Sequence, residues 1–447
     1  MKLPEAHLET IRAFLGSEFP QWEAAFSSPP PVSIRINPRK GKLPASSEKI
    51  PWTEYGCYLP QRPSFTHDPL FHAGCYYVQE ASSMSIEQVF KQHLNTGEKL
   101  RVLDLCGAPG GKSTHAISLL NDESLLVSNE VIRPRAHILA ENLAKWGRDN
   151  YIVTNSDPEQ FASLPEFFDL VIADLPCSGE GLFRRDPEAA SEWSPANVEL
   201  CSSRQRRIVH DVWASLKEGG LLIYSTCTFN THENEANLQL LKEQLGFESL
   251  PVQFPADWGV METKQNGIYG YRFFPHRLKG EGFFFSLLQK TGGGNGMPAK
   301  LKPSVPIANN REKEQAGVML RDPKLFDFFN HDGRILVFRK SISGEMQMIC
   351  RKLNIVSAGL ALAEVQKGMK PTHEAALSLQ LNRKAFHETK LSKEDALRFL
   401  AKEDVKISGT EKGISLVTYE NMPVGWLNLL GNRANNLYPK EWRIRKL

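Results

Sequence analysis

The chain has 447 residues, of which 41% are hydrophobic and 23% are charged, an ordinary composition for a globular protein. Its formal net charge of +3 is too small to establish a polyanionic partner. The seven cysteines are widely spaced and contain no C-x-x-C pair or Cys/His cluster, which argues against a disulfide framework and a zinc site. This length predicts roughly two to three domains.

The first ten residues contain no apolar targeting segment, and no apolar run approaches the roughly 20 residues that span a bilayer. Free thiols also fit a reducing compartment. We therefore expect a cytoplasmic, monomeric protein with neither a membrane nor a metal partner.

Residues 1–60 are expected to form a small α+β appendage. Apolar residues at helical spacing predict a helix within 5–26, and alternation over 32–37 predicts a strand. Three basic residues cluster at this strand: Arg35, Arg39 and Lys40. A solvated face and an edge that contacts nucleic-acid phosphates both explain this cluster.

Residues 61–290 alternate short apolar runs with amphipathic segments, as in a sheet whose strands are connected by helices. The predicted strands are 102–105, 125–129, 151–154, 170–173 and 221–225, and the predicted helices are 115–120, 133–145, 201–216 and 233–244. Two aromatic runs, 270–274 and 282–288, predict a hairpin. We therefore predict an α/β fold, a doubly wound Rossmann-like parallel sheet with one antiparallel edge.

The loop that follows the first predicted strand, 106–111, is rich in small residues and leads into a helix. Its glycines let the backbone approach a ligand closely, and the unpaired N–H groups of a helix N-terminus face outward. The run from Gly111 resembles the end of a phosphate-binding P-loop, but Cys106 stands where that pattern requires glycine. Glu130 closes the next strand, where an acid holds ribose hydroxyls. The stretch therefore favours a nucleoside cofactor over a triphosphate.

Two cysteines follow neighbouring strands of the predicted sheet, Cys177 in Asp174-Leu-Pro-Cys-Ser-Gly179 and Cys227 in Ser225-Thr-Cys-Thr228. Because the carboxyl ends of parallel strands meet at one edge, we expect both thiols beside the glycine loop. A nucleophilic thiol needs a lowered pKa, which loops at helix N-termini favour. A dithiol redox pair is the chemical rival, and the lack of a C-x-x-C motif argues against it.

Residues 291–305 contain a Gly-rich run that predicts a flexible linker, and residues 306–447 follow it as a separate C-terminal region. Strands are expected at 334–338, 355–365 and 414–419. Near the end, basic residues alternate with three rings, those of Trp426, Tyr438 and Trp442. RNA binding, through charge for phosphates and rings for stacking, and a charged tail on core aromatic residues explain this alternation equally well.

The motifs Asp104–Lys112, Asp174–Gly179 and Ser225–Thr228, in this order, resemble those of the Nol/Nop/Sun (NSUN-type) family of RNA 5-methylcytosine methyltransferases. Flanking matches at Tyr77–Ser83 and Pro275–Phe283 extend the resemblance over about residues 30–290. The C-terminal region resembles, more loosely, the RsmF/YebU-type branch, which modifies 16S ribosomal RNA. The resemblance implies a class I methyltransferase domain over 61–290, an RNA-binding appendage before it and a PUA-like RNA-binding region after it.

The resemblance also implies a covalent reaction. Cytosine C5 is a poor nucleophile, so a thiolate first adds at C6, and C5 then attacks the sulfonium methyl group of S-adenosyl-L-methionine. In this family the Thr-Cys cysteine, here Cys227, is the nucleophile, and the Pro-Cys cysteine, here Cys177, assists release of the methylated base. Asp174 is expected near both the cofactor and the polar edge of the cytosine.

The family pattern places the cofactor against residues from four strand ends. They are Cys106, Gly107, Ala108, Pro109, Gly110, Gly111, Lys112, Glu130, Arg135, Asp157 and Asp174. The implied partner is RNA, in 16S ribosomal RNA or the small ribosomal subunit. A transfer-RNA 5-methylcytosine methyltransferase and a non-catalytic RNA-binding assembly factor are the alternatives, and the presence of both cysteines argues against the second.

Overall fold

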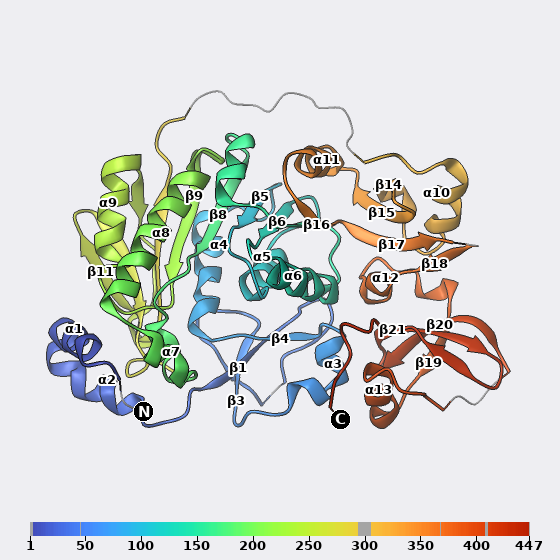
Figure 1. Ribbon diagram of the computed structural model, residues 1–447, viewed down its shortest axis with the longest axis horizontal. Helices are drawn as coiled ribbons and strands as arrows, with labels where there is room; N and C mark the ends of the chain where they lie inside the picture. The colour runs from blue at the N-terminus through green and yellow to red at the C-terminus, as the bar shows by residue number, and fades with distance from the viewer. Residues whose placement is uncertain (1–2, 45, 294–304, 367, 407–409, 447) are drawn as a thin grey trace.

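The computed structural model describes residues 3–44, 46–293, 305–366, 368–406 and 410–446. Its centre is a ten-stranded sheet in the order β11-β12-β13-β9-β8-β5-β6-β7-β16, with β10 paired to β13 (Figure 1). The five strands from β9 to β7 run parallel. They are β5 (Arg101–Asp104), β6 (Leu125–Asn129), β7 (Tyr151–Thr154), β8 (Phe168–Asp174) and β9 (Leu216–Thr226). The predicted parallel α/β sheet is confirmed.

Helices cover both faces of this sheet, because the connections between parallel strands must cross it. Buried side chains of α4 (Glu87–His93), α5 (Gly111–Leu119) and α6 (Arg133–Trp146) form the core on one face. Those of α8 (Pro195–Trp213) and α9 (Glu235–Leu245) form the core on the other face. Helix α8 begins six residues before the predicted start, because Ser194 caps it by accepting from the Asn197 N–H and Pro195 occupies its first position.

The antiparallel edge is larger than the predicted hairpin. The two expected strands are β12 (Ile268–Phe273) and β13 (Phe283–Gln289), and β10 (Glu248–Leu250) and β11 (Met261–Gln265) add to them. The opposite edge also carries an antiparallel strand, β16 (Ile355–Ala358), which pairs with β7. Because β16 comes from the C-terminal region, the central sheet is completed by residues that lie beyond position 305.

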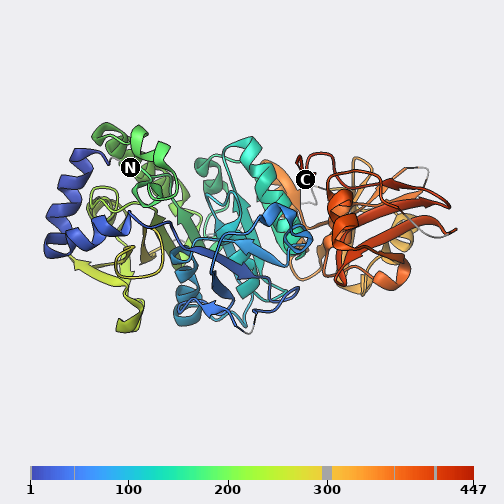
Figure 2. The same cartoon turned by 90° about the horizontal axis from the view of Figure 1, so that it is seen from below.

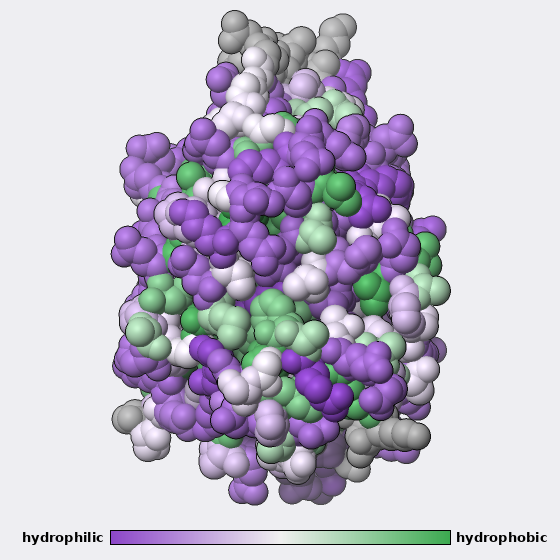
Figure 3. Space-filling view, turned by 90° about the vertical axis from the view of Figure 1, so that its left-hand side faces the viewer, coloured by the Kyte–Doolittle hydropathy of each residue, from purple (hydrophilic) through white to green (hydrophobic). Residues whose placement is uncertain are grey.

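The N-terminal region is a four-stranded sheet preceded by two helices, α1 (Glu5–Leu15) and α2 (Phe19–Ala25). The sheet has the order β2-β3-β1-β4. Its strands are β1 (Val32–Ile36), β2 (Glu48–Lys49), β3 (Gly56–Leu59) and β4 (Tyr76–Val78), so it extends past the expected boundary at residue 60; α3 (Pro69–His72) lies in its last connection. The helices pack through Ile11 and Trp22 on Phe229 and Phe274 of the central domain. On the face shown in Figure 3, apolar residues gather between hydrophilic ones in the lower half, where α1 and α2 lie in Figure 1.

Two of the three basic residues at β1 are structural. The Arg35 guanidinium is fully buried, donates to Gln79 Oε1 and Thr114 Oγ1, and lies over the Trp146 ring. Lys40 donates to three backbone carbonyl oxygens from distant segments. The hypothesis that these side chains form an edge that contacts RNA phosphates is therefore wrong, because both cations are enclosed and their N–H groups are already hydrogen-bonded within the protein.

The C-terminal region contains two four-stranded sheets, β14-β15-β17-β18 and β19-β20-β21-β22. Their strands are β14 (Phe326–His331), β15 (Arg334–Arg339), β17 (Leu360–Val365), β18 (Met369–Pro371), β19 (His387–Lys390), β20 (Lys412–Tyr419), β21 (Met422–Leu430) and β22 (Ala434–Asn436). Its helices are α10 (Asn310–Gly317), α11 (Ser343–Lys352), α12 (His373–Leu377) and α13 (Lys393–Leu400). The segment expected as one strand over 355–365 is two strands in different sheets. Of the expected linker 291–305, residues 294–304 lie outside the described residues.

The aromatic residues near the C-terminus are mostly core residues. Trp426 and Tyr438 are each 1% exposed, and the Trp426 indole donates to the Thr372 carbonyl oxygen. These two rings are therefore not free to stack on bases, whereas Trp442 is half-buried. For Trp426 and Tyr438, the structure therefore supports the alternative in which the rings are core residues.

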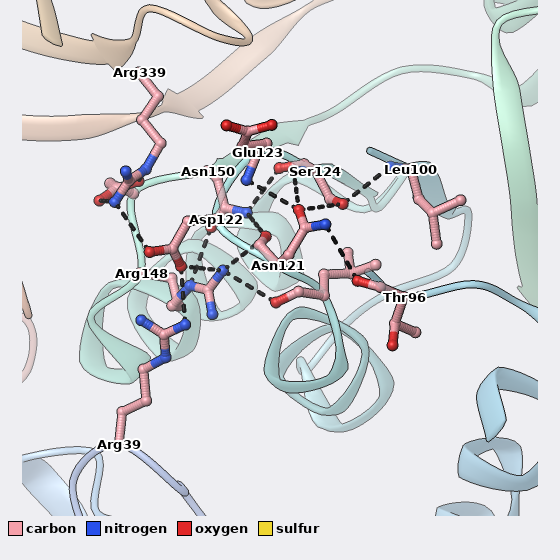
Figure 4. A network of polar contacts seen from close by, with 12 residues as sticks. Arg39, Thr96, Leu100, Asn121, Asp122, Glu123, Ser124, Arg148, Asn150 and Arg339 are labelled. Atoms are coloured by element: carbon pink, nitrogen blue, oxygen red, sulfur yellow. Dashed lines mark hydrogen bonds and ion pairs between the residues drawn. The ribbon is translucent and has the colours of Figure 1, made fainter. Parts of the chain in front are cut away.

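The three parts of the chain are joined at Asp122, in the connection that leads to β6 (Figure 4). Its carboxylate lies within ion-pair distance of Arg39 from the N-terminal region, Arg148 from the central domain and Arg339 from β15. Arg339 also binds Asp149 with two hydrogen bonds. Seen from below, the N-terminal helices and the C-terminal sheets lie at opposite ends of the molecule (Figure 2). Within the described ranges, no helix combines the length and apolarity required to cross a membrane.

Candidate active site

The glycine loop connects the carboxyl end of β5 to α5. The Gly107 N–H donates to the Asn129 carbonyl oxygen at the end of β6, 2.7 Å away. A Cβ at Gly107 would lie 2.8 Å from Ser113 Oγ and 3.2 Å from Asp104 Oδ2, so a larger residue is excluded. Gly110, with φ +119°, precedes the first turn of α5 in a conformation that other residues rarely adopt. Because these glycines have no side chain, the loop backbone is accessible from the space above the carboxyl ends of the strands.

Asp104, the last residue of β5, lies beneath this loop. Its Oδ2 accepts a hydrogen bond from Ser113 Oγ at 2.5 Å, while its buried Oδ1 has no partner among the described residues. Burial raises the pKa of Asp104 to about 7. An unpaired buried oxygen is costly, so this atom marks a place where a polar ligand group fits.

Lys112 and Asp174 form an ion pair between the glycine loop and the end of β8. Lys112 Nζ lies 2.8 Å from Asp174 Oδ2, and Ser225 Oγ donates to Asp174 Oδ1 at 2.9 Å. Burial alone would lower the pKa of Lys112, but the Asp174 carboxylate outweighs it and the pKa is raised. The Lys112 ammonium also attracts negative charge on Cys227. The Lys112 ammonium and Cys227 therefore belong to the wall of the same cavity.

The two predicted cysteines meet at the ends of β8 and β9. Cys177 Sγ lies 3.2 Å from Cys227 Sγ, and the Cys227 backbone N–H donates to Cys177 Sγ at 3.3 Å. The hydrogen bond with Cys227, and then burial, raise the pKa of Cys177 well above its ordinary value. The contact with Cys227 and burial therefore both favour the protonated form of Cys177.

Two buried glutamates hold the cysteine loops together. Glu180 Oε2 accepts hydrogen bonds from the backbone N–H groups of Phe229 and Asn230, at 2.7 and 2.9 Å. Glu233 accepts from the Ser178 N–H at 3.0 Å and from Gln205 at 2.8 Å. Each carboxylate thus connects the loop after β8 to the loop after β9, which sets the separation of the two sulfurs.

The N-terminal helix reaches this network through a residue that sequence reasoning missed. His7 of α1 is fully buried, and its Nδ1 lies 3.4 Å from Glu180 Oε1. Its ring packs against Trp22, Phe183 and Trp193. No local signal in the sequence distinguishes this histidine, because its polar partner Glu180 lies about 170 residues away.

A cavity of about 420 Å³ opens above these groups, a volume suited to a nucleoside-sized ligand. The glycine loop, Lys112, Arg135, Asp174 and Cys227 line it. It is also lined by residues given no site role above: Tyr77, Val78, Gln79, Glu80, Ser83, Leu182, Arg185, Glu281, Gly282 and Phe283. Most of these residues lie in the two flanking motifs, Tyr77–Ser83 and Pro275–Phe283. The resemblance of these motifs to the family was therefore the sequence signal that could have identified them.

The remaining expected cofactor residues lie at greater depth or distance. Glu130 is buried behind the cavity wall, 3.3 Å from Arg135 and accepting from the Ile132 N–H. Arg135 also donates to the Ala108 carbonyl oxygen and so joins α6 to the glycine loop. Asp157 caps a short 3₁₀ helix after β7 and is half exposed, with Arg207 at 3.8 Å. Within the described residues, no group of three or more His, Cys, Asp or Glu side chains has the geometry of a metal site.

Comparison with known proteins accounts for nearly the whole chain. The family described as 16S rRNA methyltransferase RsmB/F matches residues 91–289, the N-terminal domain of RsmF matches 3–81, and the RsmF PUA domain matches 386–444. The ribosomal RNA small subunit methyltransferase F of Escherichia fergusonii is 32% identical over 474 aligned residues, which cover 98% of this chain and 96% of that protein. The protein of the same name from Escherichia coli O157:H7 is 30% identical over the same shares. The chain belongs to the RsmF family of 16S rRNA methyltransferases.

Solved structures agree with this family. A methyltransferase homolog from Pyrococcus horikoshii is 26% identical, with a TM-score of 0.51 over 62% of this chain and 91% of that one. NSun6 from Pyrococcus horikoshii, solved with SFG, has a TM-score of 0.54 at 19% identity over 65% and 99%, which shows a shared fold. The resemblance to the Nol/Nop/Sun family and the RsmF-type branch, and with it an RNA methyltransferase, is therefore confirmed.

Proposed function

We propose that this RsmF-family methyltransferase transfers a methyl group from S-adenosyl-L-methionine to C5 of cytosine in 16S ribosomal RNA, through a covalent bond between Cys227 and C6. The observation that carries the proposal is the pair of sulfurs 3.2 Å apart, of which Cys227 lines the same cavity as the glycine loop. A thiol pair beside a nucleoside-sized cavity suits covalent activation of a base.

The residues present fit the methyl donor. Residues 106–109 and 111–112, with Asp174 and Arg135, line the cavity, and Glu130 lies behind this wall, paired with Arg135. The unpaired Oδ1 of Asp104 beneath the loop supports a polar ligand there. SFG, an analogue of S-adenosylmethionine, accompanies the NSun6 structure of the same fold. When bound, the donor supplies an electrophilic methyl group on its sulfonium sulfur; Asp157 is the least supported contact, since it faces Arg207 at the surface.

Cys227 begins the proposed reaction. Its thiolate, in the cavity that Lys112 also lines, adds to C6 of the cytosine and moves electron density to C5, which then takes the methyl group. Elimination then restores the aromatic ring: water takes the C5 proton, the electrons of the C5–H bond re-form the C5–C6 double bond, and the C6–S bond breaks to release the Cys227 sulfur. The base must leave its stack to reach Cys227, at a cost of a few kcal/mol.

Cys177 serves the release step in this proposal. Its raised pKa keeps a proton on its sulfur, 3.2 Å from the leaving Cys227 sulfur, so it is placed to donate that proton as the C6–S bond breaks. The assignment of Cys227, rather than Cys177, as the nucleophile is supported by its place in the wall of the cavity, which Cys177 does not line. Asp174 holds the Lys112 ammonium in place and contributes to the wall that faces the base.

The expected result in a strain that lacks the gene is the loss of one or more 5-methylcytosines from 16S ribosomal RNA. Bisulfite sequencing of total RNA measures this directly, and complementation with the wild-type gene restores the missing sites. An unchanged 16S map with a lost transfer-RNA site would transfer the proposal to transfer RNA. A wholly unchanged map would contradict both substrates.

The PUA domain and the exposed cations at its C-terminal end support an RNA partner. Arg443, Arg445 and Lys446 are exposed, whereas residues 422–430 form the core strand β21, so removal of the whole tail would unfold the domain. We expect the triple variant Arg443→Gln/Arg445→Gln/Lys446→Gln to bind RNA more weakly, because each phosphate contact releases about one counterion. The salt dependence of RNA affinity should flatten by up to about three in log–log slope.

Filter binding at several salt concentrations measures this slope. The matched control removes three exposed lysines elsewhere in the region, Lys384→Gln/Lys390→Gln/Lys393→Gln. Affinity for S-adenosylhomocysteine should be unaffected by either variant. Equal weakening by both variants would show that total charge, rather than this tail, decides RNA binding.

A further inference from the structure

Three carboxylates line the catalytic cavity among the described residues, and they differ in how far their oxygens are satisfied. Glu80 accepts from the backbone N–H groups of Ser82, Ser83 and Glu281, each at 2.9 Å. Asp174 is occupied by Lys112 and Ser225. The side chain of Glu281 is buried, with 5% of the residue exposed, and its Oε2 has no hydrogen-bond partner. Glu281 is therefore the carboxyl group on this wall with an unused polar atom.

The backbone places Glu281 next to the nucleophile. The Gly181 N–H donates to the Cys227 carbonyl oxygen at 2.8 Å, and Gly282, which follows Glu281, packs directly on Gly181. A Cβ at Gly282 would lie 2.5 Å from Gly181 Cα, so this approach requires glycine at both positions. Leu182 and Arg185, which follow Cys177 in the chain, also line the cavity. Glu281 is thus joined through Gly282 and Gly181 to the backbone of Cys227, in the wall of the cavity that Cys227 also lines.

The charge state of this carboxyl group suits a neutral base. Burial, and then the neighbouring Glu80, raise the pKa of Glu281 to about 7, against the opposing effect of Arg185, Arg184 and Arg62. A protonated carboxyl group offers one O–H donor and one carbonyl acceptor side by side. The Watson–Crick edge of cytosine offers the complementary pair, the N3 acceptor beside the N4 amino donor. Uracil presents the reverse pattern, an N3–H donor beside the O4 acceptor.

We propose that Glu281 selects the target base by pairing with the Watson–Crick edge of the extruded cytosine, donating its O–H to N3 and accepting from the N4 amino group. The inference rests on the proposed C5 methylation and names the residue that determines its base specificity. A hydrogen bond to N3 also draws electron density from the ring and favours addition of the Cys227 thiolate at C6. Arg185, 3.8 Å from Glu281 Oε1, closes the outer side of this group.

Two substitutions separate pairing from packing. Glu281→Gln keeps a donor and an acceptor in nearly the same positions, and Glu281→Leu keeps the volume but removes both. We expect Glu281→Leu to lower kcat/KM on 16S ribosomal RNA by about 10- to 100-fold, the usual worth of a two-bond base contact, and Glu281→Gln to remain within a few-fold of wild type. Calorimetric affinity for S-adenosylhomocysteine and the melting temperature should match wild type in both variants.

The pH profile gives a second readout. Wild-type kcat/KM should fall above about pH 7, because ionised Glu281 lacks the O–H donor, and this decline should be absent in Glu281→Gln. The control is Glu345→Gln, a carboxylate paired with Lys99 outside the cavity, which should retain the wild-type profile.

Three outcomes would overturn the inference: unchanged kcat/KM in Glu281→Leu, equal loss of kcat/KM in the Leu and Gln variants, or loss of S-adenosylhomocysteine affinity in both. Failure of the wild-type enzyme to methylate cytosine would instead refute the proposed function. This outcome is measured on the wild-type enzyme, without the Glu281 variants, so the two failures can be distinguished.

Discussion

Cys177→Ala enzyme incubated with 16S ribosomal RNA and S-adenosyl-L-methionine should accumulate a covalent RNA–protein adduct, and Cys227→Ala enzyme should form none. The sulfur of Cys227 still attacks C6 when Cys177 is absent, but the S–H 3.2 Å away that would assist its departure is missing. Steady-state methylation should fall by at least about 10³-fold in both variants, since one loses the nucleophile and the other the release step.

A denaturing gel with labelled RNA measures the adduct as a band of reduced mobility. The control is Cys350→Ala, a thiol of α11 remote from the cavity, which should turn over normally without a trapped band. An adduct in Cys227→Ala alone would reverse the two roles, as in DNA cytosine methyltransferases, where the Pro-Cys thiol is the nucleophile. The double variant should form no adduct under either assignment.

Glu180→Ala should be among the most destabilising single substitutions near the site. The change leaves the buried N–H groups of Phe229 and Asn230 without acceptors and removes the partner of His7. The expected loss is about 3–5 kcal/mol in the free energy of unfolding, the range for breaking a buried charged network. Methylation should fall as well, because the loops that carry Cys177 and Cys227 lose their common anchor.

The pH dependence of stability tests the charge of Glu180. Burial would raise the pKa of Glu180, but the contacts with His7, Thr228 and Asn230 outweigh it and lower the pKa to about 2 from its ordinary 4.5. A lowered pKa in the folded state adds stability that is complete above pH 4.5 and disappears as the pH falls toward 2. The gap in unfolding free energy between wild type and Glu180→Gln should therefore shrink by about 3 kcal/mol across this interval.

Urea unfolding at fixed pH values measures both effects. The control is Glu188→Ala, an exposed glutamate on α7 (Pro187–Glu192) in the same loop, which should change stability by less than about 0.5 kcal/mol. Wild-type-like stability of Glu180→Ala would mean that the cysteine loops are held by Glu233 and backbone contacts alone.

The sequence by itself determined the central sheet and the position of the chemistry. The runs around Val102, Leu126 and Leu170 are short and apolar, and helical periodicity returns between them, so local pattern alone predicts buried parallel strands. The glycine loop, Cys177 and Cys227 all follow such strands, and parallel strands deliver their carboxyl ends to one edge. The proximity of the glycine loop and the two cysteines could therefore be predicted from their positions along the chain.

Only the tertiary structure decided the contacts that have no local period. Arg35 and Lys40 look like surface cations in sequence, yet carbonyl oxygens from distant segments enclose them. Strand β16 joins the central sheet across about 200 residues of chain, because the open edge of β7 offers it backbone hydrogen bonds. The His7–Glu180 contact and the unpaired oxygen of Glu281 arise in the same way. Periodicity in the sequence indicates which face of an element is buried, but not which distant element covers that face. The contacts of Glu180 and the position of Glu281 in the cavity wall depend on such distant elements, so only the tertiary structure could reveal them.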